Sequence, residues 1–247
     1  MLTLADSTEA YSAIKNSRLR RWWTLLPALI LPLLASLFYF VLYPGTRFGN
    51  GFYTAIKVFL LVWPFVATIG ILREPLRRDL PGVVGRRRSL LEGGLFGLAV
   101  VALMLSLKEY SPLGTMMELS AAIVRQRVDG LGMLEHFTLA ACAISVVHAA
   151  LEEWYWRWFV YGNLRLLIPT PTAHLIAAIG FTSHHLIITS QFFPFGLALF
   201  LSFSVGVGGA YWSWLYQRHR TLLGPWFSHM IVDFGIFWVG YQLLFSR

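Results

Sequence analysis

Carboxylate, imidazole and guanidinium side chains lie at helical spacing within long apolar segments of this sequence. Glu152 and Glu153 are adjacent, and Arg157 follows Glu153 by four residues. His229 and Asp233 repeat the four-residue interval further along the chain. Residues four apart on a helix share a face and can pair, and a carboxylate within hydrogen-bond reach of a water molecule can act as its general base. The pattern indicates a candidate functional site, with hydrolysis, metal binding and proton transfer as open alternatives.

The two adjacent carboxylates must serve different purposes. Successive residues of a helix point about 100° apart, so Glu152 and Glu153 cannot face the same way. We expect Arg157 to pair with Glu153, while Glu152 faces a different cavity. His148 lies four residues before Glu152 and is either its partner or a bystander.

Composition and hydropathy identify the elements that carry these residues. Of 247 residues, 57% are hydrophobic and 13% are charged, whereas about a quarter of a soluble domain is charged. A transmembrane helix needs about 20 mainly apolar residues, and the apolar runs are too long and too uniform for alternating strands. The sequence predicts an all-α, polytopic membrane helix bundle of about seven transmembrane helices, with residues 1–247 as a single integral membrane domain. The predicted spans are Trp22–Tyr43, Tyr53–Leu72, Leu90–Leu107, His136–Tyr161, Thr172–Ser190, Phe193–Tyr216 and Leu222–Phe245.

Basic residues gather on one side of the predicted spans. Arginines precede the first span up to Arg21, six more lie between residues 73 and 88, and Arg218 and Arg220 follow the sixth span. The positive-inside rule then places the N-terminal segment, residues 1–21, in the cytoplasm. The orientation of the chain in the lipid bilayer thereby accounts for the excess of basic residues. Binding to nucleic acid is not needed to explain them, and we expect no nucleic-acid partner. The expected location is the inner (plasma) membrane of a bacterium.

Ionisable side chains inside a membrane are costly and mark functional sites by default. They are concentrated in the last four predicted spans, and we expect the fourth, fifth and seventh spans to surround a polar cavity. The structural alternative is that these charged residues only hold neighbouring helices together, but helix contacts in membranes mostly use small uncharged residues. A proton-coupled transporter is the functional alternative, because buried carboxylates and imidazoles can also relay protons.

Three motifs, in order on three separate apolar segments, resemble those of a known family. The motifs are Glu152-Glu153-x-x-x-Arg157, Phe181-x-x-x-His185 and His229-x-x-x-Asp233. They resemble the CAAX protease and bacteriocin-processing family, also called abortive-infection proteins, which includes the Ras-converting prenyl protease. The motif-bearing core is residues 136–245. The resemblance implies an intramembrane endopeptidase that acts on a membrane-embedded or lipidated peptide or protein.

The resemblance also implies roles for individual residues. Glu152 and His185 would activate a water molecule and His229 would stabilise the oxyanion, so these three are the candidate catalytic residues. Glu153, Arg157 and Asp233 would orient the site, while His184 is expected at its rim. The set of site residues implied by the resemblance is Glu152, Glu153, Arg157, His185, His229 and Asp233.

Two positions depart from the family pattern and bear on the mechanism. Trp158 stands where the family often has glycine, and Asp233 stands where it often has asparagine. An ionised aspartate accepts hydrogen bonds and does not donate them, so Asp233 would orient His229 or help to hold a metal. Zinc would suit a Glu/His ligand set, namely Glu152, His185 and His229, but we favour a metal-independent enzyme without cofactor. A non-catalytic scaffold or immunity protein on the same fold remains the further alternative.

Overall fold

The computed structural model describes residues 4–76 and 83–245, and every regular element in these ranges is helical. This confirms the predicted all-α class. The elements, with η denoting π-helix, are α1 (Leu4–Leu37), η1 (Phe38–Leu42), α2 (Arg47–Phe65), η2 (Val66–Ile71), α3 (Val83–Tyr110), α4 (Pro112–Leu119), α5 (Ala121–Gly130), α6 (Phe137–Ala143), η3 (Ile144–His148), α7 (Ala149–Glu153), η4 (Trp154–Tyr161), α8 (Gly162–Leu164), α9 (Thr170–Thr189), α10 (Phe195–His219) and α11 (Leu223–Phe245). Arg77 and Arg78, two arginines of the predicted charge bias, lie outside the described residues, as do residues 1–3 of the predicted N-terminal segment.

Five helices of the described chain are long and apolar enough to cross a membrane. They are Asn16–Leu42, Arg47–Ile71, Val84–Tyr110, Phe137–Leu164 and Phe195–His219. The membrane class is thus supported, but the predicted count of seven spans is not confirmed. The two remaining predicted spans form α9 and α11, which are helices of 20 and 23 residues whose polar side chains lower their hydropathy.

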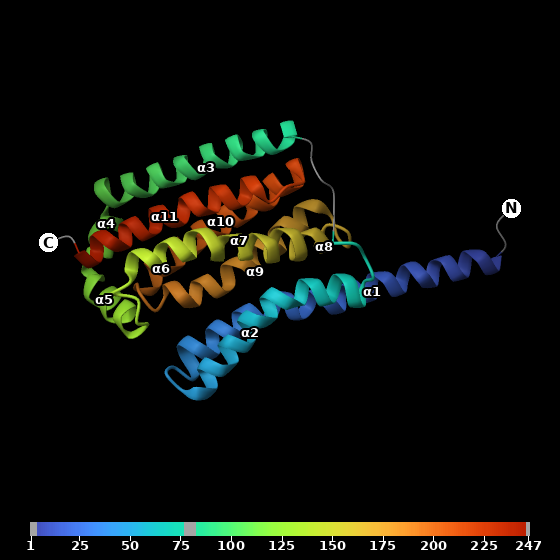
Figure 1. The fold of residues 1–247 in the computed structure, drawn as a ribbon, viewed down its shortest axis with the longest axis horizontal. Coiled ribbons are helices and arrows are strands. Elements are labelled where there is room, and N and C mark those ends of the chain that lie inside the picture. Colours follow the sequence, from blue (N-terminus) through green and yellow to red (C-terminus); the bar gives the residue numbers. More distant parts are fainter. Residues whose placement is uncertain (1–3, 77–82, 246–247) are drawn as a thin grey trace.

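The helix that carries both glutamates lies in the middle of the bundle (Figure 1). This central helix runs from α6 through η3, α7 and η4 to α8, and it contacts α9, α10 and α11. In turn, α11 packs along α3 and α10 packs along α9. The α1–α2 hairpin lies at one edge of the bundle and diverges from the other helices toward its loop (Figure 1).

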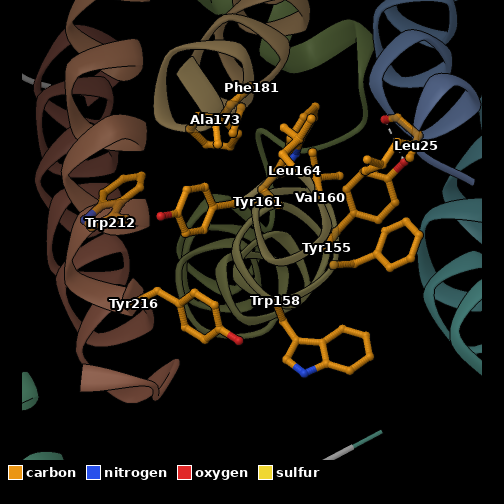
Figure 2. Packing of buried hydrophobic residues seen from close by; sticks show 14 of the residues in the cluster. Leu25, Tyr155, Trp158, Val160, Tyr161, Leu164, Ala173, Phe181, Trp212 and Tyr216 are labelled. Carbon is orange, nitrogen blue, oxygen red and sulfur yellow. Dashed lines mark hydrogen bonds between the residues drawn. The ribbon is translucent and has the colours of Figure 1, made fainter. Parts of the chain in front are cut away.

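A cluster of large apolar side chains fixes the position of η4. Figure 2 shows η4 nearly end-on, with Trp212 and Tyr216 of α10 on one side and Leu25 of α1 on the other. Tyr155 and Tyr161, which belong to η4, are almost fully buried between these neighbours. The cluster therefore holds the glutamate-bearing helix between the N-terminal hairpin and the C-terminal helices.

Two polar contacts tie α1 to the central helix. Pro32 has no backbone N–H, so the carbonyl of Ala28, four residues earlier, has no helical donor; the Tyr155 hydroxyl donates to it instead, at 2.9 Å. At the other end of the hairpin, buried Arg21 donates to Glu74, which follows η2, and to Asn163 Oδ1 of α8 at 2.6 Å. These contacts dock α1 against the central helix, whereas the sequence alone indicates only an apolar membrane anchor.

Candidate active site

Glu153 and Arg157 form a fully buried ion pair. Glu153 Oε1 lies 3.0 Å from Arg157 Nη1, and the two residues expose 0% and 1% of their surface. The predicted pair at i, i+4 is therefore confirmed. A charge at this depth must be compensated, and the pair compensates both charges at the centre of the helix bundle.

Aromatic rings enclose the guanidinium group. The Arg157 Cζ atom lies 4.3 Å from the ring centroid of Phe181 on α9 and 5.0 Å from that of Trp212 on α10. Gly209, one turn before Trp212, leaves the space that these groups need, since a Cβ there would come within 2.9 Å of Phe181 Cδ1 and 3.2 Å of Arg157 Nη2. The phenylalanine of the second motif thus packs against the arginine of the first.

His229 lies between the two glutamates. Its Nδ1 is 2.8 Å from Glu153 Oε1, and its Nε2 is 3.7 Å from Glu152 Oε2 and 3.6 Å from Asp233 Oδ1. The ring stacks on the indole of Trp212, with centroids 4.2 Å apart. Because Glu153 accepts from Nδ1, the Nε2 atom faces Glu152. The adjacent carboxylates do diverge, as expected, but they approach opposite nitrogens of one imidazole.

Glu152 faces a cluster of histidines on the side away from Arg157. Its Oε1 atom lies 3.4 Å from His148 Nε2 and 3.7 Å from His184 Nε2. His148 is therefore a partner of Glu152 rather than a bystander. His184 is 8% exposed, so the expectation that it occupies the rim is wrong: it lies in the wall beside the carboxylate.

His185 is held in one orientation by its own helix. Its Nδ1 is 2.7 Å from the carbonyl oxygen of Phe181, which can only accept, so Nδ1 donates and Nε2 is left for another partner. One ligand atom each of Glu152, His184 and His185 lies within 4.8 Å of the other two. The structure thus brings the expected Glu152 and His185 together, and adds His184.

A cavity of about 140 Å³ opens beside Glu152. It has room for several water molecules. His148, Glu152, His184 and His185 form its polar wall, and α1 and α2 close it on the other side. We expected the fourth, fifth and seventh spans to surround such a cavity. Instead, α11 contributes no lining residue, and its His229 reaches the site through its 3.7 Å approach to Glu152. The N-terminal hairpin, for which the motifs gave no role, supplies the missing wall.

The hairpin brings site residues that the motifs did not indicate. Tyr53 and Lys57 of α2 and Ser36 of α1 line the cavity, as do Tyr155 and Trp156 of η4. Lys57 is an ionisable residue in the second predicted span, outside the last four spans in which such residues are concentrated. Its charge inside an apolar segment was the signal that would have identified it.

A metal ion would find its nearest donors on the central helix and α9. Two imidazoles and a carboxylate suit zinc, whose ligands sit about 2.0–2.1 Å from the ion. The nearest three residues are Glu152, His184 and His185, rather than the predicted set, in which His229 replaces His184. Tetrahedral ligands at that bond length are only about 3.4 Å apart, so these donors would have to move closer to coordinate a metal together.

The departures from the family pattern have visible consequences. Trp158, in place of the common glycine, stacks on Trp154 with ring centroids 4.0 Å apart, and Trp154 also contacts Phe65 of α2. Asp233 stays within ionic distance of His229. With both residues present, His229 still lies 3.7 Å from Glu152 and 2.8 Å from Glu153.

The arrangement supports hydrolysis and has a counterpart among known proteins. The Glu152 carboxylate and three imidazoles line one cavity with room for water, and a further imidazole, that of His229, lies 3.7 Å from the same carboxylate. Neither a curated protein nor a solved structure matches the chain significantly. Residues 134–235, which contain all three motifs, match a family described as Type II CAAX prenyl endopeptidase Rce1-like. This match confirms the resemblance that the motifs predicted, within the segment of the chain that carries the site.

Proposed function

We propose that the protein is an intramembrane endopeptidase that hydrolyses a peptide bond of a membrane-embedded or lipidated substrate, with Glu152 and His185 holding the attacking water. The observation that carries this proposal is that both side chains face one cavity inside the segment that matches the peptidase family. A water molecule there would lie between a carboxylate that takes its proton and an imidazole that orients it.

The reaction would proceed in two steps. Water attacks the scissile carbonyl carbon while Glu152 takes a proton from it, and the negative charge of the tetrahedral intermediate develops on the former carbonyl oxygen. A protonated His229, with Nδ1 donating to Glu153, would offer Nε2–H to that oxygen. Glu152 then returns the proton to the leaving amine as the C–N bond breaks.

The remaining motif residues would position this machinery rather than contact the substrate. Arg157 holds Glu153, Glu153 holds His229 Nδ1, and Asp233 lies on the Nε2 side of the same ring. Asp233 would thus keep His229 oriented, as the asparagine of the family pattern could, and its negative charge would also favour the protonated ring. We propose this mechanism as metal-independent, with the N-terminus in the cytoplasm of a bacterial inner membrane.

The test is cleavage of a membrane peptide by the purified protein. An internally quenched, S-farnesylated peptide ending in cysteine, two aliphatic residues and methionine would be incubated with the protein in liposomes. Wild type should release fluorescence, and Glu152→Gln, which keeps size but loses basicity, should reduce the rate by about 10²–10⁴-fold. Full cleavage by Glu152→Gln would remove Glu152 from the mechanism.

The same liposomes separate the alternatives. A proton-coupled transporter would acidify or alkalinise the lumen under a gradient, without cleavage, and would lose this flux in Glu152→Gln. A scaffold would show neither activity. Comparison of membrane proteomes from cells that carry wild type or Glu152→Ala would then identify natural substrates, which should accumulate uncleaved in the variant.

A further inference from the structure

One cation lies deep in the second membrane-spanning helix. Lys57 is ten residues beyond Arg47, the first residue of the span Arg47–Ile71, and so lies about 15 Å along the helix axis. No other charged residue occurs between Arg47 and Ile71. The hydrocarbon core of a bilayer is about 30 Å thick, so Lys57 is placed near its middle, where a charge is costly and marks function by default.

Lys57 faces the candidate active site. Among the described residues that line the cavity, Lys57 is the single lysine or arginine and Glu152 is the single carboxylate. The two come from different helices, Lys57 from α2 and Glu152 from α7. Apolar side chains such as Ile56, Leu60 and Ile188 also line the cavity. The cavity therefore combines a carboxylate, a cation and an apolar lining.

The ammonium group has no anionic partner of its own in the described part of the chain. Its recorded contact is the face of the Tyr53 ring, with Nζ 5.2 Å from the centroid, and the side chain is exposed. An aromatic face attracts a cation but leaves the three N–H donors of lysine without acceptors. An anion that enters the cavity would satisfy them.

We propose that Lys57 binds a carboxylate of the peptide substrate and thereby fixes which bond reaches Glu152. The inference rests on the proposed peptidase function and adds a specificity residue to it. Lipid phosphates lie at the membrane surface, about 15 Å from this depth, and do not reach the ammonium group. An unmodified peptide offers carboxylates, either at its free C-terminus or on an acidic side chain. The apolar lining favours an apolar stretch between that carboxylate and the scissile bond.

Binding of two matched peptides tests the carboxylate site without requiring catalysis. The probe is a fluorescent, S-farnesylated peptide with an apolar end, made as the free acid and as the C-terminal amide, and titrated into Glu152→Gln protein in detergent. The free acid should bind about 10- to 100-fold more tightly than the amide, as expected for one hydrogen-bonded charge pair. Adding Lys57→Met should weaken binding of the free acid to the level of the amide and leave the amide unchanged. Lys57→Arg should retain the preference, and Lys108→Met, which removes a lysine outside the cavity, should match the parent.

A third peptide identifies the source of the carboxylate, and cleavage separates the two proposals. If a C-terminal amide with an internal glutamate binds well and depends on Lys57, the site takes an acidic side chain. The inference is overturned if the free acid and the amide of the apolar peptide bind equally and the internal glutamate adds no Lys57-dependent affinity. It is also overturned if none of the three peptides binds. Cleavage by wild type with an unchanged kcat/KM in Lys57→Met also overturns it while leaving the peptidase intact. Lys57-dependent binding without cleavage by wild type would uphold the carboxylate site and refute proteolysis.

Discussion

Removing the buried guanidinium group tests whether the site depends on the Glu153–Arg157 pair. Arg157→Ala strands Glu153 in the interior, and breaking a buried ion pair typically costs about 3–5 kcal/mol. His229 still contacts Glu153, which favours the lower end of that range. Loss of the cation–π contacts with Phe181 and Trp212 adds about 1 kcal/mol. We expect a total destabilisation of about 4 kcal/mol.

The assay is thermal unfolding in detergent together with folded yield. A loss of about 4 kcal/mol lowers Tm by roughly 8–16 °C for a chain of this size. Arg218→Ala is the matched control, because its guanidinium is more than half exposed beside Glu92, 3.3 Å away, and an exposed pair contributes about 0–1 kcal/mol. If Arg157→Ala had the Tm and folded yield of wild type, the reasoning would be refuted, because stability would then not depend on the Glu153–Arg157 pair.

A double variant distinguishes lost charge compensation from lost packing. In Glu153→Gln with Arg157→Met both charges are removed, and replacement of a buried pair by groups of similar volume is often nearly neutral. The double variant should therefore be more stable than Arg157→Ala, by about 2 kcal/mol or more. If the two are equally unstable, the guanidinium acts through its ring contacts and not through its charge.

The remaining predictions concern the walls of the site. His185→Ala should reduce turnover by about 10²–10⁴-fold. His184→Ala should lower thermal stability more than turnover, because the His184 ring is buried. Measurement of kcat and Tm on the same preparations tests both predictions. His229→Ala should reduce kcat by about 10²–10³-fold if it serves the oxyanion, and an unchanged kcat would refute that role. A chelator such as EDTA should leave activity unchanged, and inhibition that zinc reverses would overturn the metal-independent mechanism. Gly209→Ala should displace the Phe181 ring and destabilise the protein by about 1–3 kcal/mol through overpacking. This loss would appear as a lower Tm, and an unaltered Tm would contradict the close packing at Gly209.

Contacts within one helix were predictable from the sequence, and contacts between helices were not. The four-residue spacing determines that Arg157 can reach Glu153 and that Asp233 can reach His229, because a helix brings such residues onto one face. That His229 also reaches Glu153 depends on how α11 packs against α7, and no spacing along the chain contains this information. The motif order indicated which helices meet but not which atoms do.

Adjacent residues are the hardest to assign. His184 and His185 point about 100° apart on α9, so the rotation of the helix about its axis decides which of them faces the central helix, and the sequence does not fix this rotation. The structure places Nε2 of His184 near Glu152 and directs Nδ1 of His185 to the backbone, and both rings line the cavity. The motif assigns the water to His185, and only the paired substitutions can separate their roles.

The α1–α2 hairpin was misjudged for a different physical reason. Its two predicted spans, Trp22–Tyr43 and Tyr53–Leu72, contain no charged residue other than Lys57, so they resemble a lipid-facing anchor. Residues that line a cavity leave no sequence pattern of their own. Docking of α1 comes from Pro32, which frees the Ala28 carbonyl for Tyr155. Such a contact appears only when both helices are placed.

The two helices that fall short of membrane-spanning hydropathy are the two that carry the histidines of the second and third motifs. Each ionisable side chain lowers the hydropathy of its segment, and such residues are tolerated at depth where protein or a water-filled cavity surrounds them. In this fold α9 lies against α1, η4 and α10, while α11 lies against α3, α7 and α10. Of the five more apolar helices, the central helix is enclosed by its neighbours. The other four can therefore form much of the lipid-facing surface, and α9 and α11 can present polar residues inward. Low hydropathy in α9 and α11 and the presence of the site are then one property of the fold, because the polar side chains that form the site replace apolar residues on these helices.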